Sequence, residues 1–386
     1  MSRLRLLQTG DLHVGRGRTA WGEATTLGRA DRMFDVIFQT AREQKCHAVL
    51  INGDVFDTKS VTNAERELVA RKLAIYAGKN GIPTYVIPGN HDLTTAKTGN
   101  LDYLAEISKA GELPNLHIAF SQRVDVWPVA PKLSIIGAPV GFSEDQQWIE
   151  SYVANLPKDE CFIFMGHGCI QGCVRNDAGW KPSAQEDSKR LSLAKAAKLA
   201  PQVVWWAYGD IHKKQRLPTL PEGANGWYAG SPIQMDFGEQ PDRGALVVAL
   251  DDDGSGWKFT GMRYIRFDTP ENGFAPLVTV TDAAQIDALP KDALIRIAKG
   301  VVLPSERHKQ MVRELKVVDD RSLPEMTSMP LADQGIEVFD PLLSDLAVVE
   351  REVLTGLTSS EKRTEDEAKK VVALAVERYR ERTYVS

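Results

Sequence analysis

The chain has 386 residues, of which 43% are hydrophobic and 26% are charged. These values are typical of a globular protein of two or three domains, and they exclude low-complexity, collagen-like and repeat chains. The net charge of −5 excludes a uniformly basic coat for nucleic acid, although a local basic groove remains compatible with it.

Five short apolar runs, rich in β-branched or aromatic residues, predict buried strands in the first 265 residues. In chain order they are Leu4–Leu7, Ala48–Ile51, Thr84–Ile87, Cys161–Met165 and Val203–Tyr208. Helical periodicity predicts helices at Ala30–Glu43, Ala64–Tyr76 and Leu101–Ala110, and two further strands are expected at Leu133–Gly137 and Gly244–Leu250. This alternation of strands and helices predicts an α/β layer architecture.

Two clusters of chain-breaking residues, at 268–273 and 322–330, predict domain boundaries. We expect a main domain at 1–265, a small α/β cap domain at 266–330 and a helical tail at 331–386. The cap should contain strands Leu277–Val280 and Leu294–Ile297 and a helix Ser305–Glu314. Two apolar stripes in the tail, beginning at Leu342 and Ala368, indicate helices that pack on the main domain or dock onto a partner.

The amino terminus and the cysteines indicate the compartment. Residues 1–8 hold too short an apolar stretch for a signal peptide, and no run approaches the ~20 apolar residues of a membrane helix. The four cysteines lack the spacing of a disulfide framework, which fits a reducing compartment. We therefore expect a soluble, cytoplasmic protein.

Each of the five predicted strands leads to a glycine followed at once by a possible metal ligand. The pairs are Gly10-Asp11, Gly53-Asp54, Gly89-Asn90, Gly166-His167 and Gly209-Asp210. Two pairs continue to a histidine two residues further on, His13 and His212. Glycine allows the sharp turn that points the next side chain across the sheet edge. The sequence therefore predicts a metal site with seven ligands: Asp11, His13, Asp54, Asn90, His167, Asp210 and His212.

The strength of this prediction lies in the ordered set. A lone Asp-x-His is weak, because a turn with a capping aspartate gives the same string. The remaining histidines, His47, His117 and His308, are expected to be structural or solvated. Cys169 and Cys173 follow His167 closely, so a thiolate ligand is conceivable, but two free thiols in a loop is the favoured interpretation.

Mixed Asp, His and Asn ligation suits two divalent cations bridged by one carboxylate. Such a pair clamps a phosphate and lowers the pKa of a bridging water, which makes a hydroxide for in-line attack on phosphorus. Oxygen ligands with some imidazole favour Mn²⁺ or Mg²⁺ over Zn²⁺. The predicted chemistry is therefore metal-dependent hydrolysis of a phosphoester.

In this order, the motifs resemble those of the calcineurin-like metallophosphoesterases. The segments Thr9–Gly15, Gly53–Asp57 and Tyr228–Glu239 are similar to the SbcD-like family of nuclease subunits, bacterial or phage-encoded. The resemblance covers the chain well to about residue 265 and loosely beyond it. It implies a four-layer α/β fold of two facing mixed sheets flanked by helices, followed by a cap domain that contacts DNA.

The resemblance also implies roles for the ligands and their neighbours. One Mn²⁺ would be held by Asp11, His13 and His212, and the other by Asn90, His167 and Asp210, with Asp54 as the bridge. His91 would serve as general acid or stabilise the developing charge, and Asp92 would orient that imidazole or cap a helix. Members of the family usually carry histidine where this chain has Asp210, which leaves the affinity of the second ion open.

Basic residues flank the predicted site, at Arg16, Arg18, Lys213, Lys214 and Arg216. They could follow a DNA backbone, or they could be scattered surface cations. Of the five, the adjacent pair Lys213-Lys214 lies nearest in sequence to a predicted ligand, His212.

Three functions follow from these observations and the resemblance. The first is an Mn²⁺-dependent DNA exonuclease and endonuclease for recombination or repair. It would form a homodimer, work with an SbcC-like coiled-coil ATPase docked on the tail, and associate with the nucleoid or, if phage-encoded, act in the host cytoplasm. The second is a phosphoesterase for a small phosphoester or phosphoprotein, against which the extension 266–386 weighs. The third, a non-catalytic DNA-end-binding scaffold with a metal site decayed at Asp210, is disfavoured because the other ligands are intact.

Overall fold

The computed structural model describes residues 2–79, 81–95, 98–175, 183–289, 293–301, 306 and 317–320. All of them lie within one compact unit, Met1–Leu323. The predicted helix Ser305–Glu314 (apart from Glu306) and the tail at 331–386, with its predicted partner docking, lie outside the described residues. No helix in the described part of the chain is long and apolar enough to cross a membrane.

The first sheet has six strands and carries the amino-terminal ligand motifs. Its order is β12 (Trp257–Arg266), β11 (Gly244–Asp252), β1 (Ser2–Thr9), β2 (Ala48–Asn52), β3 (Thr84–Ile87) and β4 (Leu116–Ile118). Strands β1 to β4 are parallel to one another, whereas β11 pairs antiparallel with both β1 and β12. The carboxyl ends of β1, β2 and β3 therefore meet at one edge.

The second sheet also has six strands and carries the remaining motifs. Its order is β5 (Asp125–Ala130), β6 (Leu133–Gly137), β7 (Cys161–His167), β8 (Val203–Gly209), β10 (Gly226–Tyr228) and β9 (Gln215–Arg216). Strands β6, β7, β8 and β10 are parallel, with an antiparallel strand at each edge. All seven strands predicted in the main domain are confirmed.

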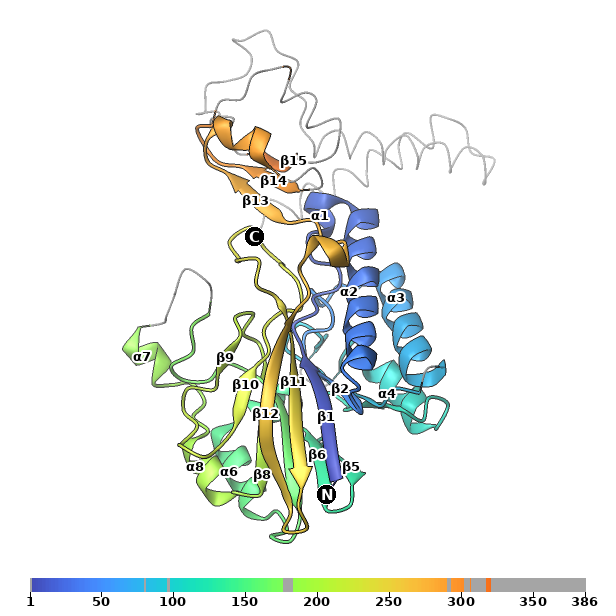
Figure 1. Cartoon of the computed structure of the whole chain (residues 1–386), viewed down its shortest axis with the longest axis vertical. Helices are drawn as coiled ribbons and strands as arrows, with labels where there is room; N and C mark the ends of the chain where they lie inside the picture. The colour runs from blue at the N-terminus through green and yellow to red at the C-terminus, as the bar shows by residue number, and fades with distance from the viewer. Residues whose placement is uncertain are drawn as a thin grey trace, which may run out of the picture. The chain divides into compact units, whose positions relative to one another are not determined.

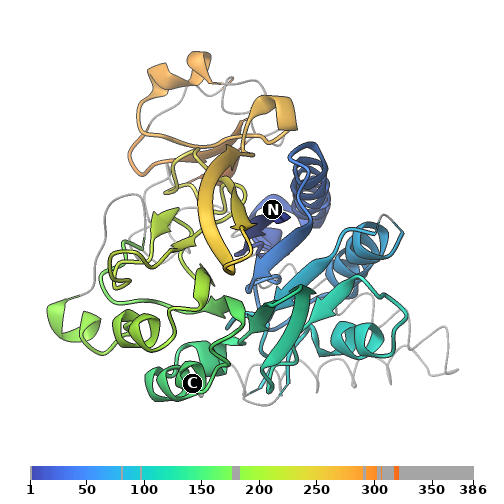
Figure 2. The same cartoon turned by 60° about the horizontal axis from the view of Figure 1, so that its bottom comes forward.

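The two sheets can pack face to face, with helices on their outer sides, because their central strands carry buried apolar residues on both faces. In β1, Leu6 lies in the core between the sheets and Leu7 in the core beneath the helices. In β8, Trp205 lies between the sheets and Trp206 on the outer face. All four side chains are fully buried. Figures 1 and 2 show the resulting layers, helix–sheet–sheet–helix, so the predicted fold class is confirmed.

Helices cover the outer face of each sheet. The first sheet is covered by α2 (Glu23–Glu43), α3 (Asn63–Leu73), which continues into a π-helical turn η1 (Ala74–Lys79), and α4 (Asp102–Lys109). The second is covered by α6 (Gln146–Ala154) and α8 (Ala194–Leu199). Shorter helices are α1 (Arg18–Trp21), α5 (Val140–Ser143) and α7 (Ala184–Asp187).

The predicted helix at Ala30–Glu43 is confirmed but begins earlier. It starts at Glu23, directly after Gly22, whose φ of 80° ends the preceding helix. Only Thr26 is buried among residues 23–29, so apolar periodicity could not reveal this first part. The other two predicted helices differ from the observed bounds by one to three residues at their ends.

A third, parallel sheet consists of β13 (Leu277–Val280), β14 (Leu294–Ile297) and β15 (Val317–Asp320). It has a small core of its own, together with the 3₁₀ helix η3 (Ala283–Ala288). The connection to it from β12 passes through a second 3₁₀ helix, η2 (Pro270–Asn272). Both predicted cap strands are confirmed. The division at residue 265 stays a prediction, since the described residues on both sides belong to the same compact unit.

Candidate metal centre

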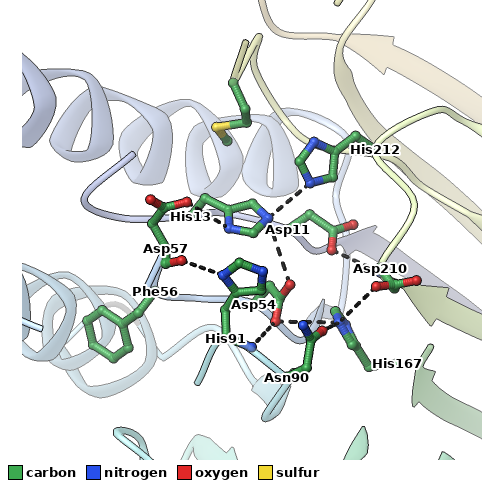
Figure 3. Close-up of polar contacts among 12 residues, drawn as sticks. Asp11, His13, Asp54, Phe56, Asp57, Asn90, His91, His167, Asp210 and His212 are labelled. Atoms are coloured by element: carbon green, nitrogen blue, oxygen red, sulfur yellow. Dashed lines mark hydrogen bonds and ion pairs between the residues drawn. The ribbon is translucent and has the colours of Figure 1, made fainter. Parts of the chain in front are cut away.

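The predicted ligands converge where the two sheets meet. Asp11, Asp54 and Asn90 follow β1, β2 and β3 of the first sheet, while His167 ends β7 and Asp210 follows β8 of the second. Figure 3 shows their side chains, with those of His13 and His212, pointing toward one another from both sheets. The structure thus brings all seven predicted ligands into one cluster.

The glycines of the motifs allow this close approach of the two sheets. A Cβ atom at Gly209 would collide with the backbone carbonyl of Asn52, at the end of β2. A Cβ at Gly53 would collide with the imidazole of His167, and one at Gly89 with Asp54. A larger residue at these positions would push the strand ends, and therefore the ligands, apart.

Several ligands have a backbone conformation that is unusual for residues other than glycine. Asp11, His13, Asp54 and Asp210 have φ values of 53°, 43°, 50° and 99°. In the described part of the chain, just two other non-glycine residues, Lys45 and Lys132, have positive φ. Such conformations cost about 1–3 kcal/mol each and persist where the surrounding structure enforces them. Their concentration at one point marks this as a built functional site.

One half of the cluster contains Asp11, His13 and His212. The Nε2 atoms of His13 and His212 lie 3.0 Å apart. Potential ligand atoms of the three residues all lie within 4.8 Å of one another. Asp11 Oδ1 accepts a hydrogen bond of 2.9 Å from the backbone amide of Asp210, while Asp11 Oδ2 is buried without a hydrogen-bond partner.

The carboxylate of Asp54 lies between the two halves. Its Oδ2 is 3.8 Å from His13 Nε2, and its Oδ1 is 3.4 Å from His167 Nε2. Its side chain is only 4% exposed. Each oxygen therefore faces a different histidine, one from each half of the cluster.

The other half contains Asn90, His167 and Asp210. His167 Nε2 lies 3.0 Å from Asn90 Oδ1 and 4.0 Å from Asp210 Oδ1. The opposite ring nitrogen, Nδ1, donates to the Asn52 carbonyl at 2.8 Å. That bond fixes the proton on Nδ1 and leaves the Nε2 lone pair for the cluster. Asp210 therefore stands where a second cation could take an oxygen ligand.

The residues fit divalent cations. Two imidazole nitrogens that face each other at 3.0 Å repel unless a proton or a cation lies near both. Asp11 Oδ2 and Asp210 Oδ2 are buried oxygens without a hydrogen-bond partner, and an unsatisfied buried carboxylate oxygen is costly. Carboxylate, amide and imidazole donors suit Mg²⁺ or Mn²⁺ by their chemistry. The cluster can hold a divalent metal.

The electrostatics of the cluster support the same conclusion. Burial alone would raise the pKa of Asp54, but the imidazoles of His167 and His13 outweigh it and hold that pKa well below its usual range. Burial would lower the pKa of His167, but Asp54 and other carboxylates raise it well above its ordinary value. The carboxylates thus make the surroundings of these buried imidazoles strongly negative, which favours a bound cation.

The structure places His91 beside the cluster and Asp92 beneath it. His91 Nδ1 donates to the Asp57 carbonyl, and its backbone amide donates to Asp54 Oδ1 at 2.9 Å. The Asp92 carboxylate accepts the backbone amides of Gly89, Val55 and Phe56 at 2.9–3.2 Å. These bonds tie the loop after β3 to the loop after β2. The recorded contacts of Asp92 are therefore with the backbone of these loops and not with the imidazole of His91.

Sequence reasoning assigned no role to three groups that lie against the ring nitrogens of the proposed histidine ligands. Asp57 Oδ1 lies 3.3 Å from His13 Nδ1, and Glu239 Oε1 lies 2.6 Å from His212 Nδ1. The third is the Asn52 carbonyl at His167. The two carboxylates stand within the segments that carried the family resemblance, which was the available signal. The role of a backbone carbonyl cannot be predicted from the sequence, because every residue has one.

Four of the five predicted DNA-contacting residues are already engaged within the protein. Arg16 pairs with Asp57 and Asp236, and Arg18 pairs with the buried Glu65. Lys214 lies over the Tyr264 ring and 3.5 Å from Asp242, while Arg216 donates to three backbone carbonyls at Leu220, Pro221 and Ala224. For Lys213, no ion pair is recorded within the described ranges.

The remaining sulfur and imidazole groups lie apart from the cluster. Cys169 Sγ lies 3.1 Å from Cys173 Sγ and accepts a hydrogen bond from Arg190. No cysteine belongs to a potential metal cluster among the described residues, so the interpretation as free thiols holds for them. His47 accepts the Arg5 backbone amide, and His117 stacks on Tyr85. His308 lies outside the described residues.

The sequence model of the calcineurin-like phosphoesterase family matches residues 4–214, more than half of the chain. The chain belongs to the calcineurin-like phosphoesterase family. This membership accounts for the fold, the ordered Gly-ligand motifs and the cluster at the strand ends, and it makes the chain a hydrolase of the phosphoesterase type.

Individual relatives show which proteins the chain is similar to. The chain is 26% identical over 264 residues to the SbcD subunit of the SbcCD nuclease of Escherichia coli (strain K12), which covers 61% of this chain and 62% of that protein. It is 24% identical over 260 residues to the protein of the same name from Bacillus subtilis (strain 168), covering 61% and 63%. The chain thus spans less than two thirds of the length of these relatives. Among solved structures, TT1561 of Thermus thermophilus is similar over 67% of this chain and 99% of that one, at 14% identity and a TM-score of 0.38.

Proposed function

We propose that the chain is a metal-dependent DNA nuclease that hydrolyses phosphodiester bonds at a centre of two divalent cations. The observation that carries the proposal is the convergence of the other six proposed ligands around Asp54, whose two oxygens face His13 and His167. Similarity to two nuclease subunits of the SbcCD complex supports DNA as the substrate. It also supports an SbcC-like ATPase as the partner and a role in DNA end processing, with a homodimer as the expected assembly.

The proposed ligand sets follow the two halves of the cluster. Asp11, His13 and His212 would hold one cation, and Asn90, His167 and Asp210 the other, with Asp54 shared between them. When bound, such cations polarise a phosphate and lower the pKa of an attacking water. Mn²⁺ is the preferred candidate and Mg²⁺ the alternative, because the donor set combines oxygens with imidazoles.

His91 is the proposed general acid for the leaving oxygen. Its Nδ1 proton is held by the Asp57 carbonyl, which fixes the ring and leaves Nε2 as the nitrogen that exchanges a proton. In the imidazolium form, Nε2 would donate its proton to the leaving oxygen. The ring of His91 lies in edge-to-face contact with that of His13, with the ring centroids 4.9 Å apart, so it stands directly beside the proposed ligands.

The proposal is tested by incubating the protein with end-labelled linear DNA in Mn²⁺, Mg²⁺ or EDTA, beside a chromogenic phosphomonoester. We expect cleavage of DNA in Mn²⁺, weaker cleavage in Mg²⁺ and none in EDTA. Turnover of the monoester alone would replace the nuclease by a phosphatase of small phosphoesters. DNA-end binding without turnover of either substrate would leave a scaffold function.

A further inference from the structure

The His212 ring is held by a carboxylate that is not part of the ligand cluster. Glu239 Oε1 lies 2.6 Å from His212 Nδ1, and Glu239 Oε2 accepts the backbone amide of Met235 at 2.7 Å. The Glu239 side chain is 11% exposed. Both of its oxygens are therefore committed inside the protein, and the carboxylate fixes both the orientation of His212 and the position of its proton.

Arg243 strengthens this arrangement. Its side chain is 3% exposed, its Nε lies 3.7 Å from Glu239 Oε2, and its Nη1 donates to the backbone carbonyl of His212. A buried guanidinium beside Glu239 stabilises the ionised carboxylate. Glu239 and Arg243 thus hold His212 at both its ring and its backbone.

The two halves of the cluster differ in what holds their histidines. His212 Nδ1 is hydrogen-bonded to the Glu239 carboxylate and His13 Nδ1 lies 3.3 Å from the Asp57 carboxylate, whereas His167 has the neutral backbone carbonyl of Asn52. A carboxylate partner makes an imidazole more basic and a stronger metal ligand than a carbonyl partner does. Removal of a carboxylate should therefore affect one half alone.

We propose that Glu239 is a positioning residue that sets the affinity of the cation held by Asp11, His13 and His212. The cation at Asn90, His167 and Asp210 does not depend on it. The inference rests on the proposed metal-dependent function but concerns metal affinity, which is measured without DNA.

The test is a titration of Mn²⁺ into the chelator-stripped full chain, followed by calorimetry. We expect two bound ions in the wild type, and Glu239→Ala should weaken one of them by roughly 10–100-fold without affecting the other. The Mn²⁺ affinity of Glu239→Gln should lie between those of the wild type and Glu239→Ala, since the glutamine amide oxygen still accepts the Nδ1 proton of His212 but carries no charge. Glu222→Gln, the same change at an exposed glutamate, is the matched control and should leave both affinities unaltered.

A second readout is the tautomer of His212, observed through its imidazole ¹⁵N shifts in the metal-free chain. We expect the Nδ1-protonated form in the wild type and in Glu239→Gln, and a mixture of tautomers in Glu239→Ala. Circular dichroism checks that each variant is folded. If Glu239→Ala does not fold, the Mn²⁺ affinities of Glu239→Gln test the positioning role.

The outcomes separate the inference from the function on which it rests. A wild type that binds no Mn²⁺ overturns the proposed function itself. A wild type that binds two ions, beside a Glu239→Ala chain that binds both equally well, overturns the positioning role alone. An equal loss at both ions contradicts the selectivity and makes Glu239 a general structural support.

Discussion

The predicted metal ligands and the predicted DNA contacts differ in how far the backbone fixes them. The ligands follow strand ends, where the fold determines the position of each Cα atom, and all seven meet in one cluster. The basic side chains are long, and four of the five are engaged by carboxylates, a ring or carbonyls of the protein. A position at the end of a strand therefore predicts where a side chain lies better than proximity in sequence to a ligand does.

Substitution of a proposed metal ligand should have the largest effect on DNA cleavage. Asp210→Ala should abolish Mn²⁺-dependent cleavage, because it removes the oxygen that stands 4.0 Å from His167 Nε2. The measurement is DNA cleavage in Mn²⁺, with Asp210→His as the comparison, since histidine is the usual residue of the family. Activity of Asp210→Ala equal to that of the wild type would remove Asp210 from the site.

A smaller loss is expected beside the ligands. His91→Gln should reduce the rate of DNA cleavage by roughly 10²–10⁴-fold, the usual contribution of a general acid, because a glutamine cannot transfer the proton. Binding of Mn²⁺ should persist, since His91 is outside the proposed ligand set. Loss of Mn²⁺ binding in this variant would instead make His91 a ligand.

The smallest effect is expected among the basic residues. Lys213→Ala should weaken DNA binding and reduce the slope of log affinity against log salt concentration by about 1, the effect of one lost phosphate contact. Binding of labelled DNA at several salt concentrations measures it, and Lys198→Ala, at an exposed lysine of α8, is the control. An equal slope in both variants would show that Lys213 makes no phosphate contact.

The sequence was sufficient to predict the fold class and the gathering of the ligands, for one physical reason. Apolar runs mark buried strands, and the carboxyl ends of parallel strands share an edge. The residues after Gly10 and Gly53 therefore had to meet in one sheet, and those after Gly166 and Gly209 in the other. The first part of α2 was not predicted as helix, because it is polar and almost none of its side chains are buried.

The features that the sequence did not predict depend on contacts between residues far apart in the chain. Glu239 lies 27 positions beyond His212, and only the folded chain brings its carboxylate to the ring. The positive φ of Asp11, His13, Asp54 and Asp210 could not be foreseen either, because non-glycine residues adopt it only when the tertiary structure enforces it. The sequence predicted Arg216 as a DNA contact because it is a basic residue near the proposed ligands. In the structure its guanidinium donates hydrogen bonds to three backbone carbonyls.

Asn52 joins the two sheets at the base of the centre. Its side-chain amide donates to the Ala207 carbonyl of β8 at 3.0 Å, and its own carbonyl orients His167 of β7 and abuts Gly209. The gap between the sheets at this end, and with it the span between opposing ligands, is thus set by a residue that binds no metal. Asn52 acts as a spacer, so the distance between the two halves of the cluster can be adjusted independently of the proposed ligands themselves.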